Sequence, residues 1–185
     1  MYYHLKRELH PILIDKMRSR DPSFKFNSWA VNDIIKTPTK FNPFRARFEY
    51  FERGENQSNV QKHLDFVNKR EIVLEQIRIE RFPEKPSRFR CFWLTHNTSD
   101  LKRWKSKILN SSDSYELFEV VPLSNTKVHF ANSKYITENE LSSKETLHAL
   151  ARKYWSVFHN TITTPFLSEV LIEGRIRIKR KIDHL

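Results

Sequence analysis

FLSEVLIEGRIRI, residues 166–178, is the stretch that decides the fold of this chain. It opens a strand-like pattern over residues 169–182, which predicts either one long bulged strand or a hairpin that turns at Glu173–Gly174. Side chains of a strand alternate between its two faces, so Glu169 lies on the face opposite Val170. The sequence therefore predicts a carboxylate at the head of a strongly apolar strand.

The other segments mix strands and helices without a regular βαβ order, which predicts an α+β fold rather than a parallel doubly wound sheet. We expect one domain over residues 1–185, with an irregular, aromatic-rich insertion around residues 21–57. Strands are predicted at residues 2–5, 89–94, 114–121 and 127–130. Helices are predicted at residues 8–20, from Asn59 to just before Pro83, from a Ser99 cap to Ile108, and from a capping box at residues 142–145 to about Trp155.

Composition excludes several classes of protein. The chain has only two glycines, too few for a phosphate-binding loop of the P-loop or Rossmann type. Its one cysteine, Cys91, lies in an apolar strand pattern, so we expect it to be buried and inert. A disulfide within the chain and a cysteine-rich zinc site are excluded, and the eight histidines show no metal-binding spacing.

The net charge of +11 indicates attraction to a polyanion, and RNA or DNA is the leading candidate. The plainer interpretation is solubility or a generally basic proteome. Neither a signal peptide nor an apolar run of membrane length is present in these residues, so we expect a cytoplasmic protein with no membrane partner.

Glu169 is the candidate catalytic residue. A carboxylate on a rigid strand beside a cleft could bond a ribose hydroxyl and stabilise a developing oxocarbenium ion, as in a glycosidase. The structural alternative, a strand-edge charge that simply reaches water, is equally common. Glu173 is the back-up candidate, although its place before Gly174 suits a turn.

Four residues in the middle of the chain and one near its start are candidate binding residues. The Ser87 hydroxyl could support a carboxylate or a ribose, and the Arg88 fork suits a pyrophosphate. Phe89 or Phe92 could stack on a nicotinamide ring, and at least one of the two belongs to the core because strand positions alternate. His4 could donate to ribose hydroxyls, but a lone strand histidine is more often structural.

Basic residues of the last strand form a candidate target-binding surface. Arg175, Arg177 and Lys179 share one strand face with Lys181, and isoleucines occupy the other face. Such a face could follow phosphates, or it could simply be solvated. A second basic group lies at residues 102–107.

In this order, these pieces resemble the ADP-ribosyltransferase superfamily, and most closely a poorly characterised bacterial and phage family with that type of core. The resemblance covers the ends and the middle of the chain but not residues 21–57. It rests on these short motifs: Tyr2-Tyr3-His4, Pro86-Ser87-Arg88-Phe89 with Phe92, Ala151-Arg152-Lys153-Tyr154-Trp155, and Glu169-Val170-Leu171-Ile172-Glu173-Gly174.

The resemblance implies two small, mostly antiparallel sheets packed face to face with flanking helices, and NAD bound in the cleft between the sheets. It makes His4 a ribose ligand and Glu169 the catalytic glutamate, and it leaves open whether Ser87 or Arg88 faces NAD. Enzymes that modify arginine commonly carry a Glu-x-Glu pair, whereas Leu167 stands at the first position here. The resemblance therefore puts an arginine acceptor in doubt.

The resemblance thus implies an NAD-dependent mono-ADP-ribosyltransferase that acts on a nucleic acid or a nucleic-acid-associated protein, with no metal. A toxin, a defence protein or a phage effector would suit so small a domain, and a toxin would have an antitoxin or inhibitor protein as a partner. The alternative is a non-catalytic nucleic-acid or protein-binding module on the same fold. A weaker third hypothesis is NAD hydrolysis or removal of an RNA 2′-phosphate.

Overall fold

A computed structural model describes residues 1–7, 19, 29–37, 57–108, 115–136, 144–157 and 168–183. Its elements, in chain order, are β1 (Tyr2–Arg7), β2 (Ile34–Lys36), α3 (Gln57–Arg81), β3 (Phe92–Leu94), α4 (Thr98–Ile108), β4 (Tyr115–Pro122), β5 (Lys127–Asn132), the 3-10 helix η1 (Ser133–Ile136), α5 (Lys144–Ser156), β6 (Ser168–Glu173) and β7 (Arg175–Ile182).

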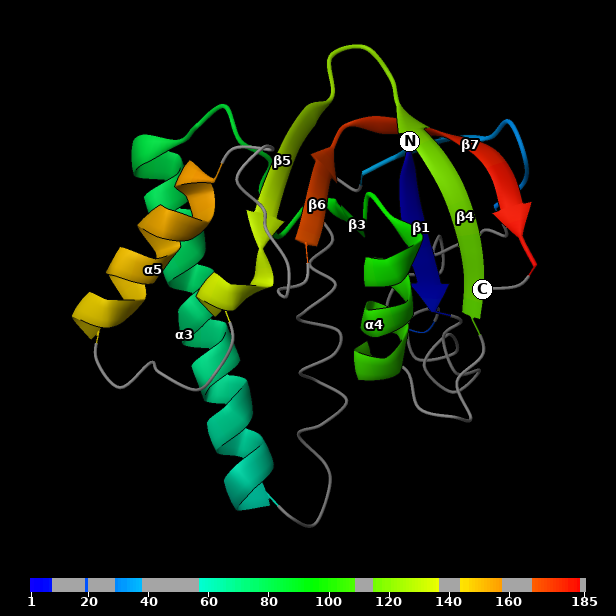
Figure 1. The fold of residues 1–185 in the computed structure, drawn as a ribbon. Helices are drawn as coiled ribbons and strands as arrows, with labels where there is room; N and C mark the ends of the chain where they lie inside the picture. The colour runs from blue at the N-terminus through cyan, green and yellow to red at the C-terminus, as the bar shows by residue number, and fades with distance from the viewer. Residues whose placement is uncertain are drawn as a thin grey trace.

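Two antiparallel sheets and three α-helices make up this described part, and the fold is α+β as expected. A four-stranded sheet has the order β1-β4-β7-β2, and a three-stranded sheet has the order β3-β6-β5. Figure 1 shows α3 and α5 on the far side of the three-stranded sheet from the four-stranded one. The three-stranded sheet therefore separates two hydrophobic layers.

The layer between the sheets consists of alternate side chains of the strands, which point inward from each sheet. Phe118 and Val120 of β4 and Ile176 and Ile178 of β7 are fully buried, and they meet Val170 and residues near it. The cluster consists of Leu94, Phe118, Val120, Val170, Ile172, Ile176 and Ile178, with Tyr2, Trp29, Ile35, Phe92, Val128 and Phe130 packed against it. Burial of each large apolar side chain contributes about 1.5–3 kcal/mol.

The second layer lies between the three-stranded sheet and the helices. Leu74 and Ile77 of α3 lie on one helical stripe, as their spacing predicts, and pack with Tyr154 and Trp155 of α5. Leu171 of β6 supplies the sheet side of this cluster. Glu169 is also on that face, because it lies two residues before Leu171 in the strand.

The chain turns at Gly174 in a way that neither sequence-based alternative anticipated. β6 pairs with β3 and β5, whereas β7 pairs with β4 and β2, so the segment forms neither a hairpin nor one continuous strand. It crosses from one sheet to the other. Gly174 has φ of +136°, a conformation open mainly to glycine, and an added Cβ would come within 3.1 Å of the Thr126 Cα.

The other predicted elements have mixed outcomes. The strands at residues 2–5, 114–121 and 127–130 and the two long helices are confirmed, with ends shifted by a few residues. The strand predicted at residues 89–94 is only Phe92–Leu94, because the residues before it form a turn closed by a 3.1 Å hydrogen bond from Arg90 N to Ser87 O.

The cap of α4 is Asn97 rather than Ser99. The Asn97 Oδ1 accepts from the backbone N of Asp100 at 2.7 Å, which satisfies one of the free amides of the first turn. The predicted helix at residues 8–20, most of the insertion at residues 21–57 and the capping box at residues 142–145 lie outside the described residues or their described side chains. No described helix is both long enough and apolar enough to cross a membrane.

Candidate functional site

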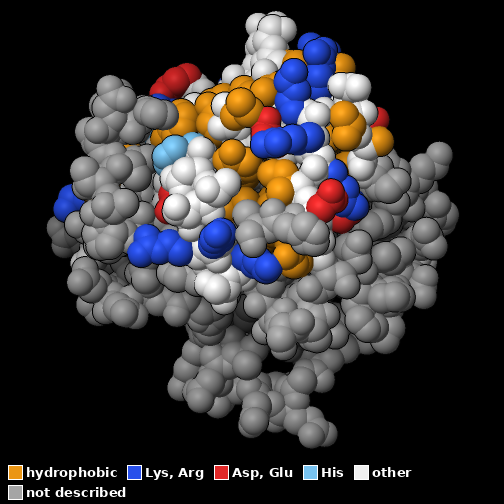
Figure 2. Space-filling view, turned by 45° about the vertical axis from the view of Figure 1, so that its right-hand side comes forward, with side chains coloured by type: hydrophobic (Ala, Val, Ile, Leu, Met, Phe, Trp, Pro, Cys, Tyr) orange, Lys and Arg blue, Asp and Glu red, His pale blue; other side chains and the backbone are white. Residues whose placement is uncertain are grey.

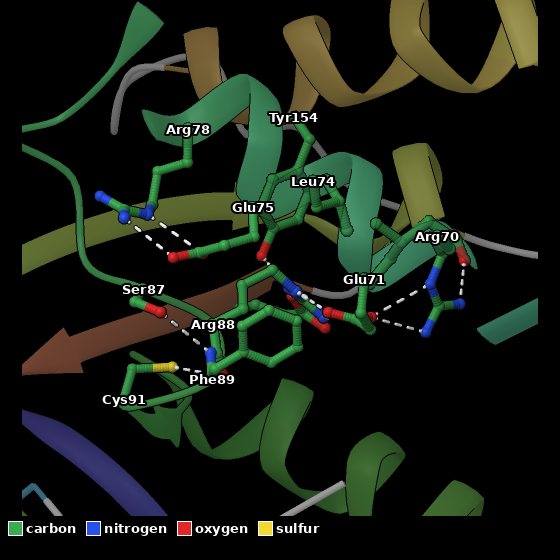
Figure 3. A network of polar contacts seen from close by, with 12 residues as sticks. Arg70, Glu71, Leu74, Glu75, Arg78, Ser87, Arg88, Phe89, Cys91 and Tyr154 are labelled. Carbon is green, nitrogen blue, oxygen red and sulfur yellow. Dashed lines mark hydrogen bonds and ion pairs between the residues drawn. The ribbon is translucent and has the colours of Figure 1, made fainter. Parts of the chain in front are cut away.

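Arg88 is the centre of a buried polar network that joins four parts of the chain (Figure 3). It lies in the turn between α3 and β3 and is 0% exposed. Its Nε donates to Glu71 Oε2 of α3 at 2.7 Å, and its Nη1 donates to Glu169 Oε2 of β6 at 2.9 Å. The same Nη1 donates to the Tyr154 hydroxyl of α5.

The charges of this network balance. Two carboxylates, Glu71 and Glu169, face two guanidinium groups, because Arg70 also donates to Glu71 Oε1, at 2.9 Å. Burial by itself would raise the pKa of Glu71, but the attraction and hydrogen bonds of Arg88 and then Arg70 outweigh it, and the pKa is lowered. The indole of Trp93 lies 4.2 Å from the Arg88 guanidinium carbon and covers its face.

One carboxylate oxygen of Glu169 is hydrogen-bonded within this network, and the other is not. The side chain is only 3% exposed. Its Oε2 accepts from Arg88 and, at 2.8 Å, from the Tyr154 hydroxyl. Its Oε1 is buried and has no hydrogen-bond donor among the described residues. A buried carboxylate oxygen without a donor is costly, so it marks a place where a ligand hydroxyl or a water would bind favourably.

The other candidates near Arg88 have structural partners. Ser87 is buried, its backbone N donates to Glu173 Oε2 at 2.8 Å, and its Oγ accepts from Phe89 N at 3.2 Å. Glu173 also pairs with Arg90 at 3.3 Å. Glu173 and Glu169 lie on the same face of β6, as strand alternation predicts.

His4 lies on the other side of the three-stranded sheet. Its Nδ1 donates to Trp93 O at 2.9 Å, and its ring stacks on Trp29 with centroids 4.9 Å apart. Phe92 meets it edge-on at 6.0 Å. Burial lowers the pKa of His4 from 6.5 to about 4, although the hydrogen bond to Trp93 opposes the shift, so the ring is neutral at pH 7.

The structure thus joins Arg88 to Glu169 and groups His4 with Phe92 elsewhere. The resemblance implied one cleft between the sheets lined by all of these residues. In the described part of the chain, the hydrophobic cluster that includes Phe92 occupies the space between the sheets. Glu169 points away from that space, toward α3 and α5, because alternation along β6 directs Val170 into it.

Glu71 and Tyr154 belong to the network although neither was a candidate. A signal for Glu71 existed, because this residue stands in the apolar stripe of a predicted helix, where an unpaired charge is too costly. Tyr154 stands in the apolar stripe of α5, and a buried tyrosine hydroxyl needs a partner. The identity of the partners could not be derived from spacing within either helix.

A second polar cluster lies on the opposite side of the start of β6. The Ser168 hydroxyl donates to Asp100 Oδ2 and accepts from His96 Nδ1 at 3.0 Å. Asn97 Nδ2 donates to His96 Nε2 at 3.2 Å, which is consistent with a proton on Nδ1. Trp104 Nε1 donates to Ser168 O at 3.0 Å. The serine lies between the acid and the imidazole, so this cluster fastens α4 to β6 and does not form a charge relay.

The three basic target-binding candidates are exposed on β7. Arg175, Arg177 and Lys179 form no ion pair with any described residue. Their neighbours on the strand differ, because Arg180 pairs with Glu119 and Lys181 with Glu116, each at 2.8 Å. Over the described ranges, no group of three or more His, Cys, Asp or Glu residues could hold a metal ion.

Comparison with known proteins identifies the family and leaves the activity open. A search of curated proteins gave no match. The model of a family described as "Protein of unknown function (DUF2441)" matches residues 2–184, nearly the whole chain. The chain therefore belongs to the DUF2441 family.

Proposed function

We propose that the protein is an NAD-dependent mono-ADP-ribosyltransferase in which Glu169 is the catalytic carboxylate. The observation that carries the proposal is the buried Glu169 Oε1, which has no donor among the described residues, on a carboxylate whose other oxygen is fixed by Arg88 and Tyr154. Two antiparallel sheets in an α+β fold agree with the two-sheet core that the sequence motifs imply. An ADP-ribosyltransferase-like fold is part of this proposal.

In the proposed reaction, the bond between nicotinamide nitrogen and ribose C1′ breaks, and neutral nicotinamide leaves with the electron pair. Positive charge develops on the ribose ring, where a carboxylate stabilises it. A nucleophilic oxygen or nitrogen of the acceptor then attacks C1′ and releases its proton. Glu169 supplies the negative charge at a rigid position, since β6 pairs with strands on both sides.

Arg88 has a supporting role in this proposal. Its Nε, Nη1 and Nη2 all donate to side chains of the network, so we assign it the orientation of Glu169 rather than contact with a pyrophosphate. Tyr154 shares this role through its hydroxyl. His4 is not needed beside Glu169, and its ring supports the packing between the sheets.

The experiment compares Glu169→Gln with Glu71→Gln. Both variants remove one negative charge from a carboxylate bonded to Arg88, but of the two only Glu169 has an oxygen without a donor among the described residues. Purified proteins are incubated with labelled NAD and with RNA, DNA or cell lysate. We expect Glu169→Gln to reduce transfer by about 100-fold or more, whereas folded Glu71→Gln keeps most of it.

Two results would reject the role of Glu169. The first is that Glu169→Gln transfers ADP-ribose as well as the wild-type protein does. The second is an equal loss in both variants at equal thermal stability, which would mean that transfer depends only on an intact network. Circular dichroism melting of each variant supplies the stability values.

The near-complete burial of Glu169 favours a second candidate, a non-catalytic nucleic-acid or protein-binding module. In that case the Arg88 network only stabilises the fold. This candidate predicts no transfer from NAD by the wild-type protein and salt-dependent binding that Glu169→Gln leaves unchanged.

A further inference from the structure

Four of the five cations of β7 form two pairs of residues that differ in their partners. Arg180 and Lys181 are neutralised by Glu119 and Glu116 of the neighbouring strand β4. Arg175 and Arg177, at the other end of the same strand, are exposed and have no carboxylate partner among the described residues. The two arginines without a carboxylate partner among the described residues therefore lie at the start of the strand, away from the neutralised pair.

The edge strand β2 adds to this end of the sheet. Lys36 lies directly opposite Arg175 in the antiparallel register, and Ile34 lies opposite Arg177. Alternation places all four side chains on the outer face, because their neighbours Ile35 and Ile176 face the core. Lys36 is exposed and has no ion-pair partner in the described part of the chain, and Ile34 is 51% exposed.

Two like charges directly opposite each other on neighbouring strands destabilise a sheet. Lys36 and Arg175 have this arrangement, and Arg177 lies next along the same face. No carboxylate among the described residues forms an ion pair with any of the three. A bound polyanion would offset their repulsion, and the chain as a whole, with its net charge of +11, attracts one.

The geometry of the group suits a linear chain of anions. Alternate residues of a strand are about 6.7 Å apart, which is comparable with the spacing of successive phosphates along a nucleic-acid strand. Figure 2 turns the right-hand side of Figure 1, where β7 lies, toward the viewer, and it shows Lys and Arg side chains among hydrophobic ones and a few Asp or Glu side chains. Arginine forks bind phosphate with two parallel hydrogen bonds.

We propose that the outer face of β7 and β2, formed by Lys36, Arg175 and Arg177, binds a single strand of nucleic acid through its phosphates. Exposed Ile34 offers an apolar contact for a base or sugar beside the cations. The bound nucleic acid would be the acceptor for ADP-ribose only if the proposed function holds. The binding itself does not depend on that function.

The test measures fluorescence anisotropy of labelled single-stranded RNA and DNA oligonucleotides, without NAD, over a series of salt concentrations. The variant Arg175→Gln/Arg177→Gln is compared with Arg180→Gln/Lys181→Gln. Both remove two positive charges from β7, but only the first pair has no carboxylate partner among the described residues. We expect the first variant to weaken binding and to reduce the slope of log K against log salt by about 0.7 for each lost phosphate contact. The control variant should change neither the affinity nor the slope by much.

Three results would overturn the proposal. They are undetectable binding of both oligonucleotides by the wild-type protein, an equal loss in the two double variants, and displacement by poly-glutamate as effective as displacement by unlabelled oligonucleotide. Stronger binding of RNA than of DNA, or the reverse, would identify which source supplies the phosphates. Binding is measured without NAD and transfer is measured with NAD, so a failure of binding and a failure of catalysis are separate results.

Discussion

Arg88 and Glu169 form a 2.9 Å ion pair in which the two side chains are 0% and 3% exposed. The pair connects the turn before β3 to the head of β6. Glu71 and Tyr154 extend it to α3 and α5, so one guanidinium group holds together the sheet and the two helices that cover it. Buried charges of this kind are strongly interdependent, because removal of one leaves the others without compensation.

Arg88→Met should therefore destabilise the protein severely. The substitution leaves Glu71 and Glu169 buried without their shared cation, and we expect a loss of about 3–5 kcal/mol in the free energy of unfolding. Urea denaturation followed by circular dichroism measures it. Arg90→Met is the control, because Arg90 is half-exposed and its pair with Glu173 should contribute less than about 1 kcal/mol. A similar small effect of both changes would contradict the importance of the network.

Stability should fall as the pH is lowered from 7 to 5. Burial is the main cause that lowers the pKa of His4 to about 4 and that of His129 to about 3, from 6.5. Between pH 6.5 and the lowered pKa values, the unfolded chain binds more protons than the folded one. The contribution of the two neutral histidines to stability is therefore fully present above pH 6.5 and is lost as the pH falls. Each histidine should contribute about 2 kcal/mol to this loss between pH 7 and pH 5.

His129→Gln checks this pH dependence. The glutamine can still donate to Tyr154 O, to which His129 Nε2 donates at 3.1 Å, but it cannot take up a proton. We expect the difference in unfolding free energy between pH 7 and pH 5 to shrink by about 2 kcal/mol relative to the wild-type protein. An unchanged difference would mean that His129 has an ordinary pKa in the folded state.

Cys91 should be unreactive in the folded protein. Burial raises the pKa of its thiol, and the Sγ donates to Arg88 O at 3.6 Å. We expect iodoacetamide to label it on the order of 100-fold more slowly in native buffer than in denaturing urea. A Cys91→Ser/Lys179→Cys variant places the single thiol at an exposed position of β7 and should react quickly in both conditions. Rapid labelling of native wild-type protein would contradict burial of Cys91.

Lys36→Glu should stabilise the protein and weaken nucleic-acid binding. The change replaces a like-charge pair with an opposite-charge pair across from Arg175, which is worth about 0.2–1 kcal/mol. Thermal unfolding and oligonucleotide anisotropy are measured on the same samples. Lys36→Gln should give a smaller effect of the same sign in both assays. A destabilised Lys36→Glu variant would show that the two side chains do not repel each other.

Local sequence patterns predicted most of the described elements. The helical spacing of Leu74 and Ile77 identified α3, and alternation identified β4 and the face of β6 that carries Glu169. These patterns report which side of an element is buried, because burial repeats with the period of the backbone. They also indicated that Cys91 is buried, which the structure confirms.

The tertiary structure decided which elements meet. Gly174 permits a sharp change of direction, but only the pairing of β6 with β3 and β5 and of β7 with β4 and β2 makes it a crossing between sheets. The strand face of Glu169 followed from its neighbours in sequence. Its contact with Arg88, 81 residues earlier, did not, since ion pairs depend on distances that only packing sets. For the same reason, the sequence determined that β7 is rich in cations, and the structure determined which of them carboxylates neutralise.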